Sequence, residues 1–185
     1  EPLIRQIETF GFFLAKLDIR QHSEVHRMAV AELLEKAGVV KTGYLALPEG
    51  EKIKILSNEL LCIRPLVPVH SHITEETREV LDTLKTIKEV QEDFSWDAVG
   101  SYIVSMTHNA SDVLTLLLLA KEVGLCGIDG GGRIFNRIDI APLFETIDDL
   151  QRLPKILNNL FNNKAYKRYL AERENIQEVM LGYSD

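Results

Sequence analysis

The feature that most constrains the fold is a series of four short apolar runs separated by helical patterns. The runs cover residues 11–19, 98–106, 137–144 and 176–183. In each of them apolar and β-forming residues follow one another with little polar alternation, which is typical of strands buried on both faces. Strands of this kind, joined by helical crossovers, predict an α/β fold with a parallel sheet.

Helical patterns fill the segments between these runs, at residues 23–37, 48–61, 74–90, 109–124, 148–161 and 164–173. Thr74 and Asn109 stand where N-terminal caps are expected. Four strand-and-helix units in 185 residues average about 46 residues each, compared with about 31 in a plain eight-fold barrel. The sequence therefore predicts either an open doubly wound sheet or half of a decorated barrel.

The composition excludes some classes of function. Aspartate and glutamate outnumber lysine and arginine by 28 to 21, and the resulting net charge of -7 argues against nucleic acid or an anionic membrane as the main partner. The longest apolar run, residues 113–120, is too short for a membrane span of about 20 residues. Cys62 and Cys126 form no C-x-x-C pattern, so we expect two buried thiols in a reducing, cytoplasmic setting.

Both ends of the chain suggest a segment of a longer protein. The first residue is Glu1, and no signal-peptide pattern follows it. Residues 179–185 read as a strand that stops without a covering element. We therefore expect one segment, residues 1–185, truncated at both ends.

Candidate functional residues lie where the predicted strands end, because parallel α/β folds gather reactive side chains there. Glu145 and Asp185 are the first acidic residues after two successive apolar runs. Neighbouring strands lie about 4.8 Å apart, so two such carboxylates can reach one hard cation, Mg²⁺ or Mn²⁺. Arg20 offers a permanent cation for a phosphate or carboxylate. The alternatives are helix N-caps for the two acids and a salt bridge for Arg20.

Other polar motifs give weaker signals. His22 and His26 are four residues apart, but the glutamate of the zinc-protease motif is not adjacent to the first histidine. His70, His72 and His108 read as solvated or hydrogen-bonded side chains. The glycine-rich stretch 127–132 lacks the Gly-Lys-Ser/Thr of a phosphate loop, so we expect a flexible linker there.

Several blocks, in the same order along nearly the whole chain, resemble the phosphoenolpyruvate carboxylase family. These blocks are ETFGF at 8–12, LDIRQ at 17–21 with Ser23 and His26, RPL at 64–66, EETRE at 75–79, YIVSM at 102–106 with SDVL at 111–114, PLFETIDDL at 142–150 and VMLGYSD at 179–185.

The resemblance implies an α/β, TIM-like barrel decorated with extra helices, of which this helix-rich chain would supply about four parallel strands. It implies that Glu145 and Asp185 bind Mg²⁺ or Mn²⁺ and that Arg20 contacts phosphoenolpyruvate as a catalytic and substrate-binding residue. It also implies a cytoplasmic enzyme that forms homo-oligomers, namely tetramers, at full length.

The reaction implied by the resemblance is carboxylation of phosphoenolpyruvate by bicarbonate, which gives oxaloacetate and phosphate for the tricarboxylic acid cycle. Bicarbonate attacks the phosphorus, and the resulting carboxyphosphate releases CO₂, which the enolate of pyruvate captures. The family's catalytic histidine and mobile glycine-rich loop would lie outside this segment, so we expect the segment alone to be inactive.

Two rival interpretations stay open. The chain could come from a non-catalytic relative that serves as a scaffold or regulatory binding module, although intact Arg20, Glu145 and Asp185 argue against that. It could also belong to another Mg²⁺-dependent barrel enzyme that acts on an enolpyruvyl substrate, although the blocks above disfavour this.

Overall fold

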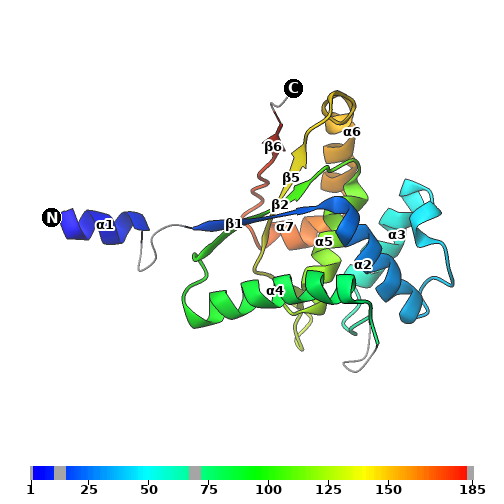
Figure 1. The fold of residues 1–185 in the computed structure, drawn as a ribbon, viewed down its shortest axis with the longest axis horizontal. Coiled ribbons are helices and arrows are strands. Elements are labelled where there is room, and N and C mark those ends of the chain that lie inside the picture. The colour runs from blue at the N-terminus through cyan, green and yellow to red at the C-terminus, as the bar shows by residue number, and fades with distance from the viewer. Residues whose placement is uncertain (1, 11–15, 67–71, 183–185) are drawn as a thin grey trace.

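A computed structural model describes residues 2–10, 16–66 and 72–182, and it has an α/β fold rich in helices (Figure 1). The helices and strands are, in chain order, α1 (Pro2–Phe10), β1 (Leu17–His22), α2 (Ser23–Lys36), the 3₁₀ turn η1 (Tyr44–Ala46), α3 (Glu49–Leu60), α4 (Glu75–Asp93), β2 (Val99–Ser105), α5 (Ala110–Glu122), β3 (Cys126–Ile128), β4 (Ile134–Asn136), β5 (Asp139–Phe144), α6 (Ile147–Asn162), α7 (Lys164–Ala171) and β6 (Met180–Leu181).

The main sheet has four parallel strands in the order β1-β2-β5-β6. Ile103 of β2 pairs with Arg20 of β1 on one side and with Ala141 of β5 on the other. The parallel sheet with helical crossovers confirms the α/β prediction. Within the described part of the chain the sheet stays open, so barrel closure remains a prediction.

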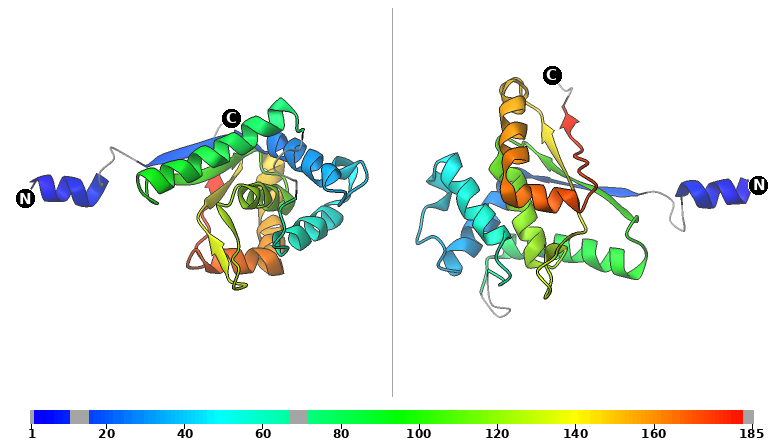
Figure 2. Two further views of the ribbon diagram at one scale, coloured as in Figure 1. Left: turned by 90° about the horizontal axis from the view of Figure 1, so that it is seen from below. Right: turned by 180° about the vertical axis from the view of Figure 1, so that it is seen from behind.

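Helices α2 to α7 pack against one face of this sheet, whereas α1 lies apart from it (Figure 1). The large core contains Tyr102, Val104, Ile140 and Phe144 of the strands together with residues from α2, α3, α4, α5, α6 and α7. Its centre is α5, in which every residue from Ala110 to Ala120 is buried (Figure 2). The other face carries a separate small cluster of Ile103, Ala141, Leu143 and Met180. The sheet therefore has one face covered by helices and a second face on which no described helix packs.

A buried polar network ties β1 to β2 beside the predicted site residue Arg20. The Tyr102 hydroxyl donates to Gln21 Oε1 at 2.5 Å, and His26 Nε2 lies 3.0 Å from the same hydroxyl oxygen. His26 is fully buried, and its Nδ1 has no hydrogen-bond partner among the described residues. Burial is the main cause that lowers the pKa of His26 to about 4, so this ring is neutral at pH 7.

The first strand differs from its predicted range and burial. It spans Leu17–His22 rather than residues 11–19, and residues 11–15 lie outside the described part of the chain. Burial on both faces is also wrong for this strand, because its residues are exposed or half-buried. This strand pairs only with β2, and the polar residues Arg20, Gln21 and His22 take part in that pairing. A strand with one neighbour can therefore form without an apolar sequence.

The fourth strand is shorter than predicted. Only Met180–Leu181 pairs with β5, whereas the sequence predicted a strand over residues 176–183. The Gln177 side chain donates to the Ile140 carbonyl at 2.7 Å. This bond occupies a backbone acceptor of β5 with which a longer β6 would pair. Residue 183 lies outside the described residues.

The glycine-rich stretch is a β-hairpin turn, so the prediction of a flexible linker is wrong. Strands β3 and β4 pair antiparallel, and Asp129 closes the turn by accepting from the backbone N–H groups of Gly131 and Arg133. The Arg133 backbone bond is the largest cause that lowers the pKa of Asp129. Backbone bonds close the turn as well, because Asp129 N donates to Arg133 O at 2.8 Å and Gly132 N donates to Asp129 O at 2.9 Å.

Several local predictions are confirmed. Thr74 caps α4 through its hydroxyl, which accepts from Thr77 N at 3.3 Å. Asn109 and Asp112 form the capping box at the start of α5. Both cysteines are free, but only Cys126 is buried, while Cys62 is half-exposed. A membrane-spanning helix is absent from the part of the chain that the structure describes.

Replacing Leu118 in α5 tests the central role of that helix. Leu118 is completely buried, so Leu118→Ala should lower the free energy of unfolding by about 2–5 kcal/mol through lost burial and a residual cavity. Urea unfolding measures this change. Leu3→Ala, at a position 65% exposed on α1, is the control and should change it by less than about 0.5 kcal/mol. Equal effects would contradict this description of the core.

The buried His26 predicts a specific pH dependence of stability. Its pKa is about 4 in the folded state and 6.5 ordinarily, so its contribution is complete above pH 6.5 and declines as the pH falls toward 4. Between pH 7 and pH 4.5 this decline amounts to about 2.5 kcal/mol. His26→Gln does not titrate and keeps a nitrogen donor near Nε2. Urea unfolding at both pH values should show a loss that is smaller by about that amount in the variant, and equal losses would refute the assignment.

Candidate functional site

The carboxyl ends of the strands meet at one edge of the sheet. His22 at the end of β1 pairs with Ser105 at the end of β2, and Phe144 at the end of β5 pairs with Leu181 of β6. Thr107 N donates to Leu143 O at 3.1 Å, which joins the ends of β2 and β5. The residues that follow these strands are therefore close to one another, as the sequence predicted.

Arg20 and Glu145 contact each other at this edge. Arg20 Nη2 lies 2.6 Å from Glu145 Oε1, although the residues come from β1 and from the end of β5, with β2 between them. Arg20 is in register with Ile103 and Ala141, and so it shares the helix-free face of the sheet. The structure thus brings two of the three predicted site residues together.

The ion pair contributes more to orientation than to stability. The Arg20 side chain is 58% exposed and that of Glu145 is 22% exposed. A pair that water reaches to this extent contributes roughly 0–1 kcal/mol. Its effect is to aim an arginine and a carboxylate at one point on the open face, where an anion and a cation could be held side by side.

Gly182 brings the last described part of the chain against Glu145. Gly182 N donates to Phe144 O at 2.8 Å. A Cβ at residue 182 would lie 2.9 Å from the Glu145 Cα, a distance that real side chains do not adopt. Only glycine allows this approach. The chain that continues from Gly182 toward Asp185 therefore leaves from directly beside Glu145.

Asp185 itself lies outside the described residues, and its role stays a prediction. Glu145 nevertheless fits a hard cation. It is a carboxylate whose Oε1 faces Arg20, it is partly open to solvent, and its backbone touches the segment that leads to a second carboxylate. Among the described residues, no group of three or more His, Cys, Asp and Glu side chains could hold a metal by itself.

A strained residue follows β2 at the same edge. Met106 has a φ of 53°, in the left-handed region of backbone conformation that residues other than glycine and asparagine seldom adopt. The Ser23 hydroxyl donates to Met106 O at 2.7 Å, which fixes the peptide from the start of α2. Backbone strain of this kind often accompanies functional sites.

A second polar cluster, which no sequence motif predicted, lies beside this edge. His108 Nδ1 donates to both carboxylate oxygens of Asp149 at 2.9 Å. Asp149 is fully buried and also accepts from the Thr146 hydroxyl at 2.6 Å and from Arg152 at 2.7 Å. Burial raises the pKa of Asp149, but the bonds from Thr146 and His108 and the charge of Arg152 outweigh it, so the pKa lies below its usual range.

Among the described residues, His22 and His26 have separate structural roles. His22 caps α2, with Nδ1 accepting from Glu24 N at 3.1 Å, while His26 lies inside the polar network with Tyr102. His70 lies outside the described residues.

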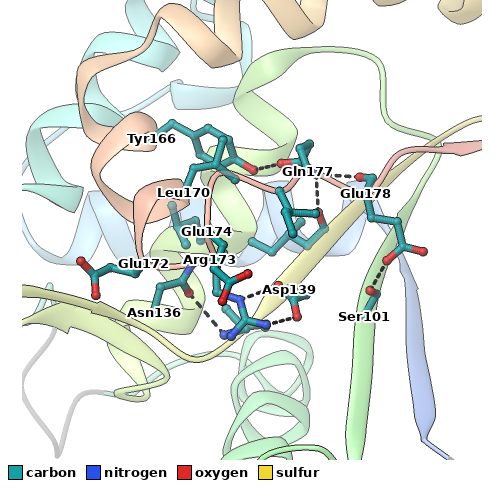
Figure 3. A pocket seen from close by; sticks show the side chains of 14 residues that line it. Ser101, Asn136, Asp139, Tyr166, Leu170, Glu172, Arg173, Glu174, Gln177 and Glu178 are labelled. Atoms are coloured by element: carbon teal, nitrogen blue, oxygen red, sulfur yellow. Dashed lines mark hydrogen bonds and ion pairs between the residues drawn. The ribbon is translucent and has the colours of Figure 1, made fainter.

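A cavity of about 400 Å³ lies near the opposite ends of the strands (Figure 3). Its polar side chains bond to one another: Arg173 with Asp139, Tyr166 with Gln177, and Ser101 with Glu178. Ser101 and Asp139 are paired near the start of β2 and β5, away from Glu145. The bonds around this cavity therefore attach the segment before β6 to the sheet, and the cavity is separate from the candidate site.

The chain is similar in sequence to known proteins of one family. The model of the phosphoenolpyruvate carboxylase family matches residues 1–185. Relatives named phosphoenolpyruvate carboxylase include those of Rhodothermus marinus (46% identity over 96% of this chain), Roseiflexus castenholzii (46% over 99%) and Synechocystis (40% over 100%). The chain spans only about a fifth of the length of these relatives, 19%, 19% and 20% respectively. The chain belongs to the phosphoenolpyruvate carboxylase family.

Proposed function

We propose that this chain is one segment of the catalytic barrel of an enzyme that carboxylates phosphoenolpyruvate with bicarbonate, giving oxaloacetate and phosphate. The observation that carries the proposal is the contact between Arg20 and Glu145 at the carboxyl edge of a parallel sheet, in a chain that matches this family along its whole length. Catalytic groups of α/β barrels occupy that edge.

The distribution of helices supports the barrel. In a doubly wound sheet helices cover both faces, whereas in a barrel they cover only the outer face. Here helices α2 to α7 pack on the face of Tyr102 and Val104, and among the described residues the opposite face carries the small cluster around Ile103 and Ala141. That second face would become the barrel interior once further strands continue the sheet beyond β1 and β6.

Each site residue has a chemical role in the proposed reaction. Arg20 holds the phosphate or carboxylate of phosphoenolpyruvate through a planar guanidinium on the open face. Glu145, together with Asp185, would hold Mg²⁺ or Mn²⁺. When bound, such a cation supplies Lewis-acid stabilisation of the negative charge that develops on the enolate oxygen. Arg20 also orients Glu145, which keeps the two charges of the site at a fixed separation.

The proposal extends to the whole enzyme. The reaction would feed oxaloacetate to the tricarboxylic acid cycle in the cytoplasm, and the full-length enzyme would be a homo-oligomer, namely a tetramer. Because the chain spans about a fifth of its relatives, the groups that complete the site would come from elsewhere in the enzyme. We therefore propose that residues 1–185 alone do not catalyse the reaction.

A full-length chimera tests the proposed function. In it, this chain replaces the matching segment of the Rhodothermus marinus relative. The chimera should form oxaloacetate in a bicarbonate- and Mg²⁺-dependent manner, measured by coupled reduction with malate dehydrogenase. Glu145→Gln should lower kcat/KM by at least about 100-fold, because it removes a charged cation ligand.

Glu178→Gln is the matched control, since Glu178 is an acid near β6 that bonds Ser101 at the other end of the sheet. It should leave kcat/KM within about threefold. An active chimera in which both substitutions have the same small effect would contradict the role proposed for Glu145.

A further inference from the structure

His108 occupies the loop between β2 and α5, at the same edge as Glu145, and its backbone is held firmly. The buried Asp112 carboxylate accepts from the backbone N–H groups of His108 and Asn109 at 2.9 and 3.0 Å. Arg27 of α2 donates to the other oxygen of Asp112 at 3.2 Å. The position of His108 is thus fixed from both α2 and α5.

The side chain of His108 reaches from this loop to the start of α6. Its Nδ1–H donates to Asp149, while 30% of the side chain stays exposed. Asp149 lies in the first turn of α6, four residues after Glu145 and within the same turn that leaves β5. The bond is therefore a link between two elements that are about 40 residues apart in sequence.

The remaining partners of Asp149 are local. Thr146 is the N-cap of α6, and Arg152 lies three residues after Asp149 in the same helix. These two donors hold Asp149 within its own helix but do not fix where the turn sits relative to the sheet. Among the described side-chain contacts of Asp149, only His108 ties the turn to a neighbouring strand.

We propose that His108 is a positioning residue for Glu145, acting through Asp149 on the turn that presents the cation ligand. The inference rests on the proposed function, because it assigns a role in the same site. A divalent cation requires its carboxylate ligands within a narrow range of distances, so a loosened turn lowers cation affinity before it lowers the rate at saturation. The contact of Arg20 with Glu145 fixes only the tip of that side chain.

The test compares substitutions of His108 in the full-length chimera. His108→Leu removes the donor to Asp149, whereas His108→Asn keeps an amide nitrogen close to the position of Nδ1. The dissociation constant for Mn²⁺, measured by titration calorimetry of the chimera without substrate, should rise about tenfold in His108→Leu and stay within about twofold in His108→Asn, and the Mg²⁺ concentration for half-maximal rate should change in parallel. The kcat at saturating Mg²⁺ should change by less than about threefold in both.

Arg152→Leu is the matched control, because Arg152 donates to the same carboxylate from within α6. It should leave the Mg²⁺ constant within about twofold, even if it lowers the melting temperature. If His108→Leu does not fold, His108→Gln takes its place, since its amide nitrogen lies near Nε2, beyond the donor position that Asp149 requires. The same tenfold rise is then expected.

The outcomes separate this inference from the proposed function. If Glu145→Gln abolishes Mg²⁺ dependence but the His108 variants keep the normal Mg²⁺ constant, the positioning role is wrong and the function stands. If Glu145→Gln leaves activity unchanged, the proposed function fails first. An equal rise in the Mg²⁺ constant for His108→Leu and Arg152→Leu would assign the effect to helix stability and overturn the proposal.

Discussion

The parallel register of β1, β2 and β5 is the constraint on which the rest of the structure depends. With Arg20, Ile103 and Ala141 in line, the three strands end together, and the loops that follow them meet at one edge. A shift of one residue along β1 would turn Arg20 toward the helices and Gln21 toward the open face, because side chains alternate along a strand. The buried bonds among Gln21, Tyr102 and His26 oppose that shift.

One face of the sheet stabilises the fold, and the other face carries the candidate site residues. The helix-covered face buries the large apolar core, in which α5 is enclosed on all sides, and such burial provides most of the folding free energy. The other face holds few apolar residues and presents the Arg20–Glu145 pair. The polar links at the carboxyl edge, through Ser23, Asp112 and Asp149, position the loops without depending on that open face.

Local chemistry made part of this structure predictable from the sequence. Caps such as Thr74 and Asn109 depend on neighbouring residues, and the location of Arg20 and Glu145 at one edge follows from the common edge where parallel strands end, although their ion pair was not predicted. The hairpin at Asp129 and the short β6 depend on individual side-chain bonds, which apolar periodicity does not report. The link between His108 and Asp149 joins residues 41 positions apart, and nothing in either local sequence indicates it.

In the proposed function, Glu145 and Asp185 would hold one divalent cation beside Arg20. Anomalous diffraction at the manganese edge, from crystals of the full-length chimera soaked in Mn²⁺, tests it most directly. We expect one strong peak with carboxylate oxygens of both residues at coordination distance, about 2.0–2.6 Å. A peak elsewhere in the enzyme, or a structure in which Asp185 points away from Glu145 with Mn²⁺ bound, would contradict it.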